Sequence, residues 1–126
     1  MVVLDTSALL YWTLAPDRLS TRAADAIDAA QQVVISSISI WEIGLQVKRA
    51  KLALPLSIEA YVTHLKEVDR MHIEPVREAT WLKNLALDWE HRDPADRTIV
   101  ATARLLGCPL ITSDLEIRSF YSEAIW

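Results

Sequence analysis

Short apolar runs alternate along the chain with longer stretches in which hydrophobic residues recur every three or four positions. The short runs are typical of strands covered on both faces, and the periodic stretches are typical of amphipathic helices. We expect strands at residues 2–4, 33–36, 71–73, 109–112 and 124–126.

Helices are expected between these strands, and several carry clear boundary signals. Ser20 and Ser57 are typical N-cap residues, and Gly107 is typical of the position just after a helix. Strands separated by helices predict an α/β fold in one domain, residues 1–126, with a mostly parallel sheet of four or five strands flanked by helices. The expected helices cover residues 8–12, 23–30, 39–50, 58–68, 78–87 and 93–106.

The composition fits a globular chain with a substantial core. The 126 residues are 52% hydrophobic and 24% charged, with only two glycines and five prolines, which excludes disordered and collagen-like chains. No apolar run approaches the roughly 18 residues of a membrane span, and Asp5 comes too early for a secretory signal. The single Cys108 excludes an internal disulfide and a cysteine-based zinc site. We therefore expect a soluble, cytoplasmic protein without a membrane partner.

The charge balance bears on the class of partner. A net charge of −4, from 13 basic and 17 acidic side chains, argues by itself against nucleic acid. The argument fails where acidic residues surround bound cations, because the metal reverses the local field. The positions of the acidic residues therefore decide the question.

Two aspartates directly follow hydrophobic strands. Asp5 ends the run at residues 2–4, and Asp114 follows the run at residues 109–112. Ligands of parallel sheets bind beyond the carboxyl ends of the strands, so neighbouring strands would bring these two carboxylates to one edge. The structural alternative is that each aspartate caps the following helix.

Glu42 lies on the third expected helix, beside an apolar stripe formed by Ile38, Trp41 and Leu45. A carboxylate at the edge of a buried stripe is costly unless it is paired or binds a metal. An ion pair with Lys48 or Arg49 is the alternative explanation.

Two further acids open the sixth expected helix. Asp93 at the N-cap and Pro94 after it are capping signals, which gives Asp93 a supporting structural role. Asp96 shares its helix face with Ile99 and Val100, so it is expected to point inward. We therefore assign Asp96 to function.

Gathering four carboxylates requires compensation. No lysine or arginine is close enough in sequence to neutralise them all, and hard Mg²⁺ or Mn²⁺ ions suit carboxylate oxygens. Divalent ions held in this way activate water and stabilise the leaving oxygen of a phosphodiester, which is nuclease chemistry. The four candidate metal ligands and catalytic residues are Asp5, Glu42, Asp96 and Asp114.

At these positions the sequence resembles PIN-domain ribonucleases of the VapC toxin type, from toxin–antitoxin systems. The resemblance implies a three-layer fold, Mg²⁺ held by the four acids, cleavage of RNA, a homodimer, and inhibition by a small antitoxin protein. It also implies that the hydroxyl groups of Thr6, Ser7 and Thr112 assist the acids. Ala95, where many relatives carry a bulkier residue, and Glu116 after the last motif depart from the pattern. The matching segments, in order, are residues 3–9, 39–43, 93–97 and 110–114.

Several other residues have a functional and a structural interpretation. Lys48, with Arg49 and Lys51, would contact RNA phosphates or complement the end of its helix. Arg97 would orient a phosphate or pair with an acid such as Asp93, and Arg92 would contact RNA or lie at the surface.

The aromatic residues and histidines carry weaker signals. Tyr11 and Trp12 are candidates for a dimer or antitoxin contact, and the tryptophans would stack bases or fill the core. The histidines His64, His72 and His91 lack the spacing of metal ligands and are not expected to be catalytic.

The sequence thus predicts a Mg²⁺-dependent endoribonuclease, with two alternatives. An aspartyl phosphatase with Asp5 as nucleophile normally has a second acid two residues later, where this chain has Ser7. A non-catalytic binding module would keep the fold and use the acidic pocket for a basic partner peptide. Nucleotide-cradling folds are disfavoured because no glycine-rich loop is present.

Overall fold

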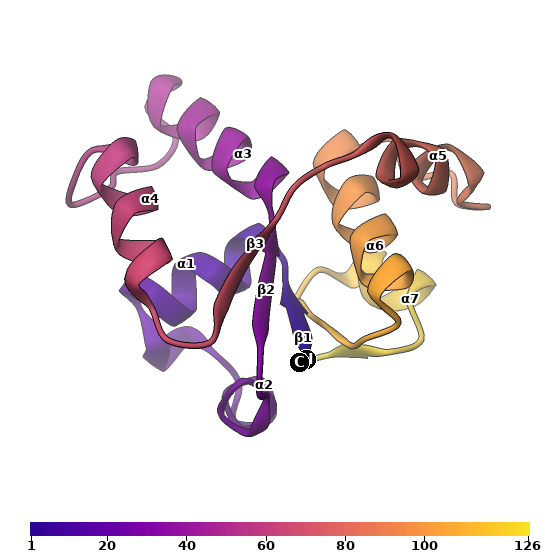
Figure 1. Cartoon of the computed structure of the whole chain (residues 1–126), viewed down its shortest axis with the longest axis horizontal. Coiled ribbons are helices and arrows are strands. Elements are labelled where there is room, and N and C mark those ends of the chain that lie inside the picture. The colour runs from indigo at the N-terminus through magenta and orange to yellow at the C-terminus, as the bar shows by residue number, and fades with distance from the viewer.

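The computed structural model describes all residues from 1 to 126 and has a five-stranded, all-parallel sheet at its centre (Figure 1). The strands lie in the order β3-β2-β1-β4-β5, and β1 therefore occupies the middle, with Val3 paired to Val34 and Leu110. All five expected strands and their parallel arrangement are confirmed. The strands are β1 (Val2–Leu4), β2 (Val33–Ser36), β3 (Met71–Glu74), β4 (Leu110–Ile111) and β5 (Ala124–Ile125).

The six expected helices are present, and a seventh short helix, α7, was not predicted. Its six residues are too few to show a helical repeat, although Asp114 provides its N-cap. The helices are α1 (Thr6–Leu14), α2 (Thr21–Ala29), α3 (Ser37–Lys48), α4 (Ile58–Glu67), α5 (Glu78–Ala86), α6 (Pro94–Leu106) and α7 (Leu115–Phe120), with a short 3₁₀ helix η1 (Pro16–Arg18) after α1.

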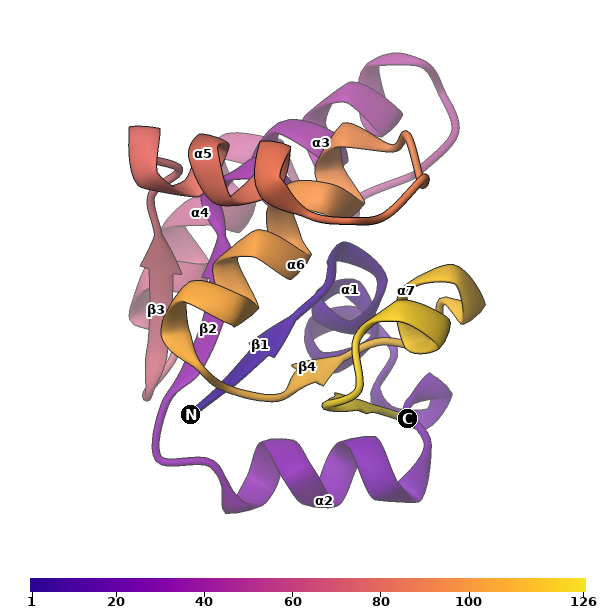
Figure 2. The ribbon, with the colours of Figure 1, turned by 90° about the vertical axis from the view of Figure 1, so that its right-hand side faces the viewer.

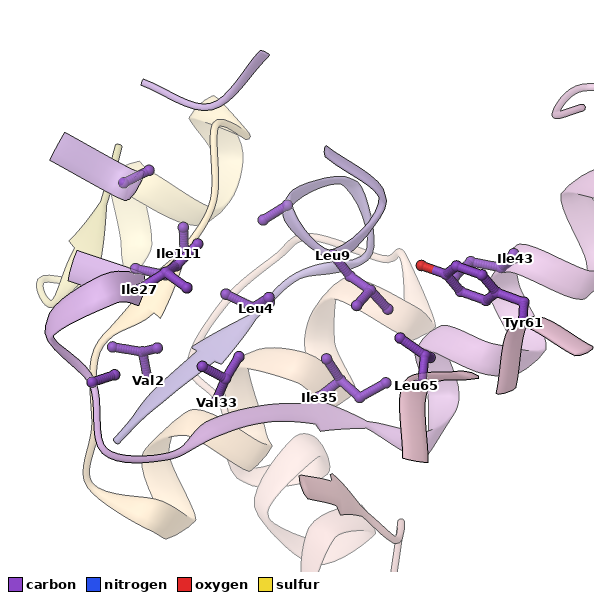
Figure 3. Packing of buried hydrophobic residues seen from close by; sticks show 13 residues of the cluster. Val2, Leu4, Leu9, Ile27, Val33, Ile35, Ile43, Tyr61, Leu65 and Ile111 are labelled. Carbon is purple, nitrogen blue, oxygen red and sulfur yellow. The ribbon is translucent and has the colours of Figure 1, made fainter. Parts of the chain in front are cut away.

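The helices cover both faces of the sheet, which gives three layers (Figures 1 and 2). Successive strand residues point to opposite faces, so Leu4 and Ile35 pack under α1 to α4, whereas Val3 and Val34 pack under α6 and α7. Figure 3 shows the first of these cores, where Leu9, Tyr61 and Leu65 meet the sheet from the helices. The continuous apolar strands are explained by this burial on both sides.

The orientation of α3 differs from the prediction. The buried residues of this helix are Ser39 and Ile43, whereas Trp41 is 56% exposed and does not belong to a buried stripe. The small Ser39 side chain lets α3 approach α1, where the hydroxyl of Thr6 donates to that of Ser39 at 3.0 Å. Glu42 lies beside the buried face formed by Ser39 and Ile43. The prediction that Glu42 points inward is therefore correct, although the apolar stripe on which it was based is not the buried face.

The lengths and hydropathies of the helices bear on the expectation that no segment spans a membrane. None of them combines the length and the apolar character that crossing a bilayer would require.

Candidate functional site

Four carboxylates from four different segments line one pocket at the carboxyl edge of the sheet. Asp5 follows β1, Asp114 follows β4, Glu42 comes from α3, and Asp96 comes from the first turn of α6. The cavity holds about 170 Å³ and has mainly polar walls. The two aspartates that follow strands meet because β1 and β4 are neighbours. The remaining residues of the wall are Thr6, Ser7, Leu10, Gln46 and Ser113.

Asp5 lies deepest and is fixed by hydrogen bonds to both carboxylate oxygens. Its side chain is the N-cap of α1, with Oδ1 accepting from the backbone N–H of Ala8 at 2.7 Å. The hydroxyl of Thr112 donates to Oδ2. Burial raises the pKa of Asp5 to about 6, and the charges of Asp96 and Asp114 add to that rise against these hydrogen bonds. The group is therefore held in one orientation and ionises reluctantly.

Glu42 is half-buried and forms no ion pair, although Lys48 and Arg49 follow it on the same helix. The ion-pair explanation of this residue is therefore wrong. Burial raises the pKa of Glu42, and the charges of Asp93 and Asp96 raise it further despite an opposing effect of the Thr6 hydroxyl. Glu42 thus contributes an uncompensated carboxylate to the pocket.

Asp93 and Asp96 point in different directions at the start of α6. Asp93 is the N-cap of α6, and its Oδ1 accepts from the backbone N–H of Asp96 at 2.8 Å. The side chain of Asp96 turns into the pocket, where Oδ2 lies 2.8 Å from Nε2 of His91. Burial raises the pKa of Asp96, and the hydrogen bond from His91 opposes this rise. The same hydrogen bond raises the pKa of His91.

Asp114 combines the two interpretations that the sequence left open. Its Oδ1 caps α7 by accepting from the backbone N–H of Ile117 at 3.1 Å, and the residue also lines the pocket. The backbone N–H of Asp114 donates to Oγ1 of Thr112 at 3.0 Å. Thr112 therefore connects Asp5 to Asp114 through a single hydroxyl.

The donor chemistry of the pocket fits a hard divalent cation. Carboxylate oxygens are the preferred ligands of Mg²⁺ and Mn²⁺, and no lysine or arginine forms an ion pair with any of the four acids. The acids surround the cavity, and no three His, Cys, Asp or Glu side chains already form a cluster close enough to hold an ion. The pocket thus supplies the ligands but not a closed ligand cage.

The sequence profile described as the PIN domain matches residues 2–122. The chain belongs to the PIN-domain family. Ribonuclease VapC22 of Mycobacterium tuberculosis is 33% identical to it over 120 residues, which cover 94% of this chain and 90% of that protein. The VapC-type resemblance seen in the sequence is therefore confirmed.

Solved structures show the same fold as this PIN domain. A toxin–antitoxin complex from Klebsiella pneumoniae contains a chain with a TM-score of 0.70 and 20% identity, over 100% of this chain and 97% of that one. VapC20 of Mycobacterium tuberculosis, a sarcin–ricin loop cleaving toxin, has a TM-score of 0.66 and 17% identity, over 94% of each chain. The predicted three-layer PIN fold is confirmed.

Arg97 of this PIN domain has a role that the sequence did not indicate. Its guanidinium donates to the backbone carbonyls of Asn84, Leu87, Trp89 and His91 and to the side-chain oxygen of Asn84. Arg97 therefore does not pair with Asp93, and its guanidinium is not free to bind a phosphate. It holds the loop between α5 and α6 instead. That loop positions His91 next to Asp96.

His91 is the site residue that sequence reasoning missed. It sits in an irregular loop, where no hydrophobic repeat indicates which way a side chain points. Its ring also lies against Trp89, with centroids 4.7 Å apart, and its Nδ1 is 3.9 Å from the exposed Glu116. Lys48 and Arg92 are exposed and do not line the pocket.

Proposed function

We propose that this PIN domain is a metal-dependent endoribonuclease that acts as the toxin of a VapBC-type toxin–antitoxin system. The single observation that carries the proposal is the convergence of Asp5, Glu42, Asp96 and Asp114 on one pocket without a lysine or arginine to neutralise them. These four carboxylates would hold Mg²⁺, or Mn²⁺ in its place. The cytoplasm, where RNA is available, is the proposed place of action.

The protein groups around the pocket prepare it for hydrolysis of a phosphodiester. A bound divalent cation lowers the pKa of water and stabilises charge that develops on the phosphate oxygens. Thr112 and the N-terminus of α1 orient Asp5, and His91 orients Asp96. Ser7 stands exposed at the wall of the pocket, within the first turn of α1. Direct attack by water leaves 5′-phosphate and 3′-hydroxyl ends.

The chemistry of the RNA ends tests the proposed mechanism. We expect purified protein with Mg²⁺ to cut RNA into fragments with 5′-phosphate ends, and chelation with EDTA to stop the reaction. Asp96→Asn should lower the cleavage rate by about a hundredfold or more, because it removes a charged ligand. Asp25→Asn, at an exposed position of α2 that lines neither the pocket nor the neighbouring cleft, is the matched control, and its rate should stay within a fewfold of wild type. Fragments with 2′,3′-cyclic phosphates would contradict hydrolysis by water.

The phosphatase alternative receives no support from the position of Asp5. This side chain is only 5% exposed, and both of its carboxylate oxygens already accept hydrogen bonds. A nucleophilic carboxylate must be reached in line by the phosphorus of its substrate, and the burial of Asp5 leaves little access for that approach. The binding-module alternative predicts partner binding without Mg²⁺ and no RNA cleavage, so the same cleavage assay decides it.

The proposed partners are RNA, a small antitoxin protein and a second copy of the chain. Leu82 and Leu85 on α5 are 66% and 78% exposed, and exposed apolar side chains of this size support an interface. Tyr11 and Trp12, the candidates for a dimer or antitoxin contact, are half-buried, and Trp12 lines an apolar cleft of about 340 Å³ between α1 and α4. Growth arrest on induction, relieved by co-expression of the neighbouring small reading frame, would support the toxin role.

A further inference from the structure

A second and larger cleft adjoins the carboxylate pocket. It holds about 630 Å³ and shares Glu42 and Gln46 with that pocket, so the two cavities have a common wall on α3. Its other side chains include Trp41, the cations Arg49 and Lys51, and the carboxylate of Asp93 at the opposite wall, at the N-cap of α6, whereas the carboxylate pocket contains no basic residue. A polymer bound across the four acids would therefore meet an indole and two cations next.

Trp41 presents an unoccupied aromatic face to this cleft. Its side chain is 56% exposed, and no other aromatic ring stacks on it. Tryptophan is normally well buried, so an exposed indole in a cleft is an informative exception. Flat aromatic faces bind unpaired bases by stacking, with little dependence on the identity of the base.

Arg49 and Lys51 are free to bind an anion. Both are exposed, and neither takes part in an ion pair or a side-chain hydrogen bond. The backbone fixes their position, because α3 ends at Lys48 with Arg49 as its C-cap, and Ala50 adopts a left-handed conformation with φ of 55°. Seven residues separate Glu42 from Arg49, which is about 10 Å along the helix. Neither cation forms an ion pair with Glu42 or with another acid of the site, so both remain available to an anion.

We propose that this cleft binds a nucleotide of single-stranded RNA next to the cleaved bond, with its base stacked on Trp41 and its phosphate beside Arg49 and Lys51. The inference rests on the proposed ribonuclease function and adds a substrate subsite to it. Local cations matter in this chain because its net charge of −4 repels RNA elsewhere. An indole beside two cations suits a nucleotide better than a peptide, because a basic peptide would be repelled by Arg49 and Lys51.

The test compares RNA affinity with RNA cleavage. A fluorescently labelled, single-stranded RNA of mixed sequence is titrated with protein in Ca²⁺ and followed by anisotropy, and its cleavage is measured in Mg²⁺. For this RNA we expect Trp41→Ala to raise Kd and KM about tenfold with kcat nearly unchanged, and Trp41→Phe to restore both values. An abasic position in the RNA should produce the same loss in wild type and no further loss in Trp41→Ala.

Charge variants test the phosphate contact separately. The double variant Arg49→Gln, Lys51→Gln should weaken binding and lower the slope of log affinity against log salt by about 0.7, the value for one phosphate contact on a single strand. Lys66→Gln on α4 is the matched control for charge, and Leu105→Ala near the C-terminal end of α6, at 45% exposure, is the control for the loss of an exposed apolar side chain. Neither control should change Kd by more than about twofold, the scatter expected of substitutions at ordinary surface positions.

Two results would overturn the subsite. Equal Kd values for wild type and Trp41→Ala exclude base stacking there. Equal weakening by Trp41→Ala and Leu105→Ala assigns the loss to a general effect of removing exposed apolar surface and excludes a base-stacking role of Trp41. Failure of the wild type to cut RNA in Mg²⁺ refutes the proposed activity alone, since the Kd comparison still decides the subsite.

Discussion

Asp5 illustrates how a single buried carboxyl makes stability depend on pH. Its pKa rises from 3.8 to about 6, chiefly through burial, so the folded protein binds this proton more tightly than the unfolded chain. Below about pH 4 the group is protonated in both states and costs nothing. Between about pH 4 and 6 the unfolded chain ionises this group while the folded protein keeps it protonated, so stability falls, and above about pH 6 the loss is complete.

Replacing Asp5 with asparagine should therefore stabilise the protein at pH 8 but not at pH 4. The pKa shift corresponds to a loss of about 3 kcal/mol in the free energy of unfolding when the group is fully ionised. Because an amide accepts weaker hydrogen bonds than a carboxylate, we expect Asp5→Asn to recover about 2 kcal/mol of this loss. Urea denaturation in EDTA at the two pH values measures the difference. The exposed Asp25→Asn on α2 is the control and should change little. An identical effect of Asp5→Asn at both pH values would refute the assignment.

Individual site residues were predictable where a repeat or a strand end indicated their position. Asp5 and Asp114 follow apolar runs, and Asp96 faces the same way as Ile99, so the sequence indicated which way each points. Arg97 and His91 act through contacts with an irregular loop, whose path depends on tertiary packing. No local pattern indicates such contacts, and the prediction for Arg97 was accordingly wrong.

At the scale of elements, the end of α3 contains a conformational cost. The backbone N–H of Lys51 donates to the carbonyl of Gln46, and that of Ala50 donates to Val47, which is the Schellman pattern. Glycine usually occupies the left-handed position in this pattern, but here it is Ala50, with φ of 55°. The end of α3 therefore has its backbone hydrogen bonds satisfied, but its left-handed conformation is unfavourable for Ala50.

Ala50→Gly should raise the free energy of unfolding by about 1 kcal/mol, because glycine adopts this conformation without a Cβ penalty. Thermal denaturation should show an increase in Tm of about 3–5 °C. Arg70→Gly provides the contrast, since Arg70 also has a positive φ of 67° but its guanidinium donates to the carbonyls of Ile27 and Ala30. That variant should destabilise the protein, and a loss of stability in Ala50→Gly would contradict the expectation.

The loop between α5 and α6 depends on one side chain. Arg97→Lys should cost about 2 kcal/mol, because an ammonium group cannot reach the four carbonyls and the amide oxygen that the planar guanidinium contacts. Hydrogen exchange should rise selectively around His91. Arg92→Lys, at an exposed position in the same loop, is the matched control. If hydrogen exchange around His91 is the same in both variants, Arg97 does not hold the loop in place.

The helices and strands were predicted more completely than the sides of the helices that are buried. Five strands and six helices follow from apolar runs and helical spacing, whereas α7 is too short to show a repeat. The buried face of α3 was misassigned because its contact with α1 is made by Ser39 and Thr6. Small polar residues that permit close approach resemble surface residues in a sequence.

For the whole molecule, the parallel sheet determines where negative charge accumulates. Its central strand β1 and its neighbour β4 end together, and α3 and α6 bring two more acids to that edge. The fold therefore concentrates like charges that no lysine or arginine neutralises, which reduces stability in the absence of a cation.

This balance predicts that Mg²⁺ stabilises the protein beyond any effect of salt. A ligand that binds only the folded state at about one hundred times its Kd adds about 2.7 kcal/mol, or roughly 10 °C in Tm for a domain of this size. Glu42→Gln should raise Tm in EDTA by removing repulsion and should reduce the increase caused by Mg²⁺. Differential scanning calorimetry in EDTA, in MgCl₂ and in NaCl of equal ionic strength separates these effects. If NaCl raises Tm as much as MgCl₂, screening alone accounts for the stabilisation and the four carboxylates do not form a cation site.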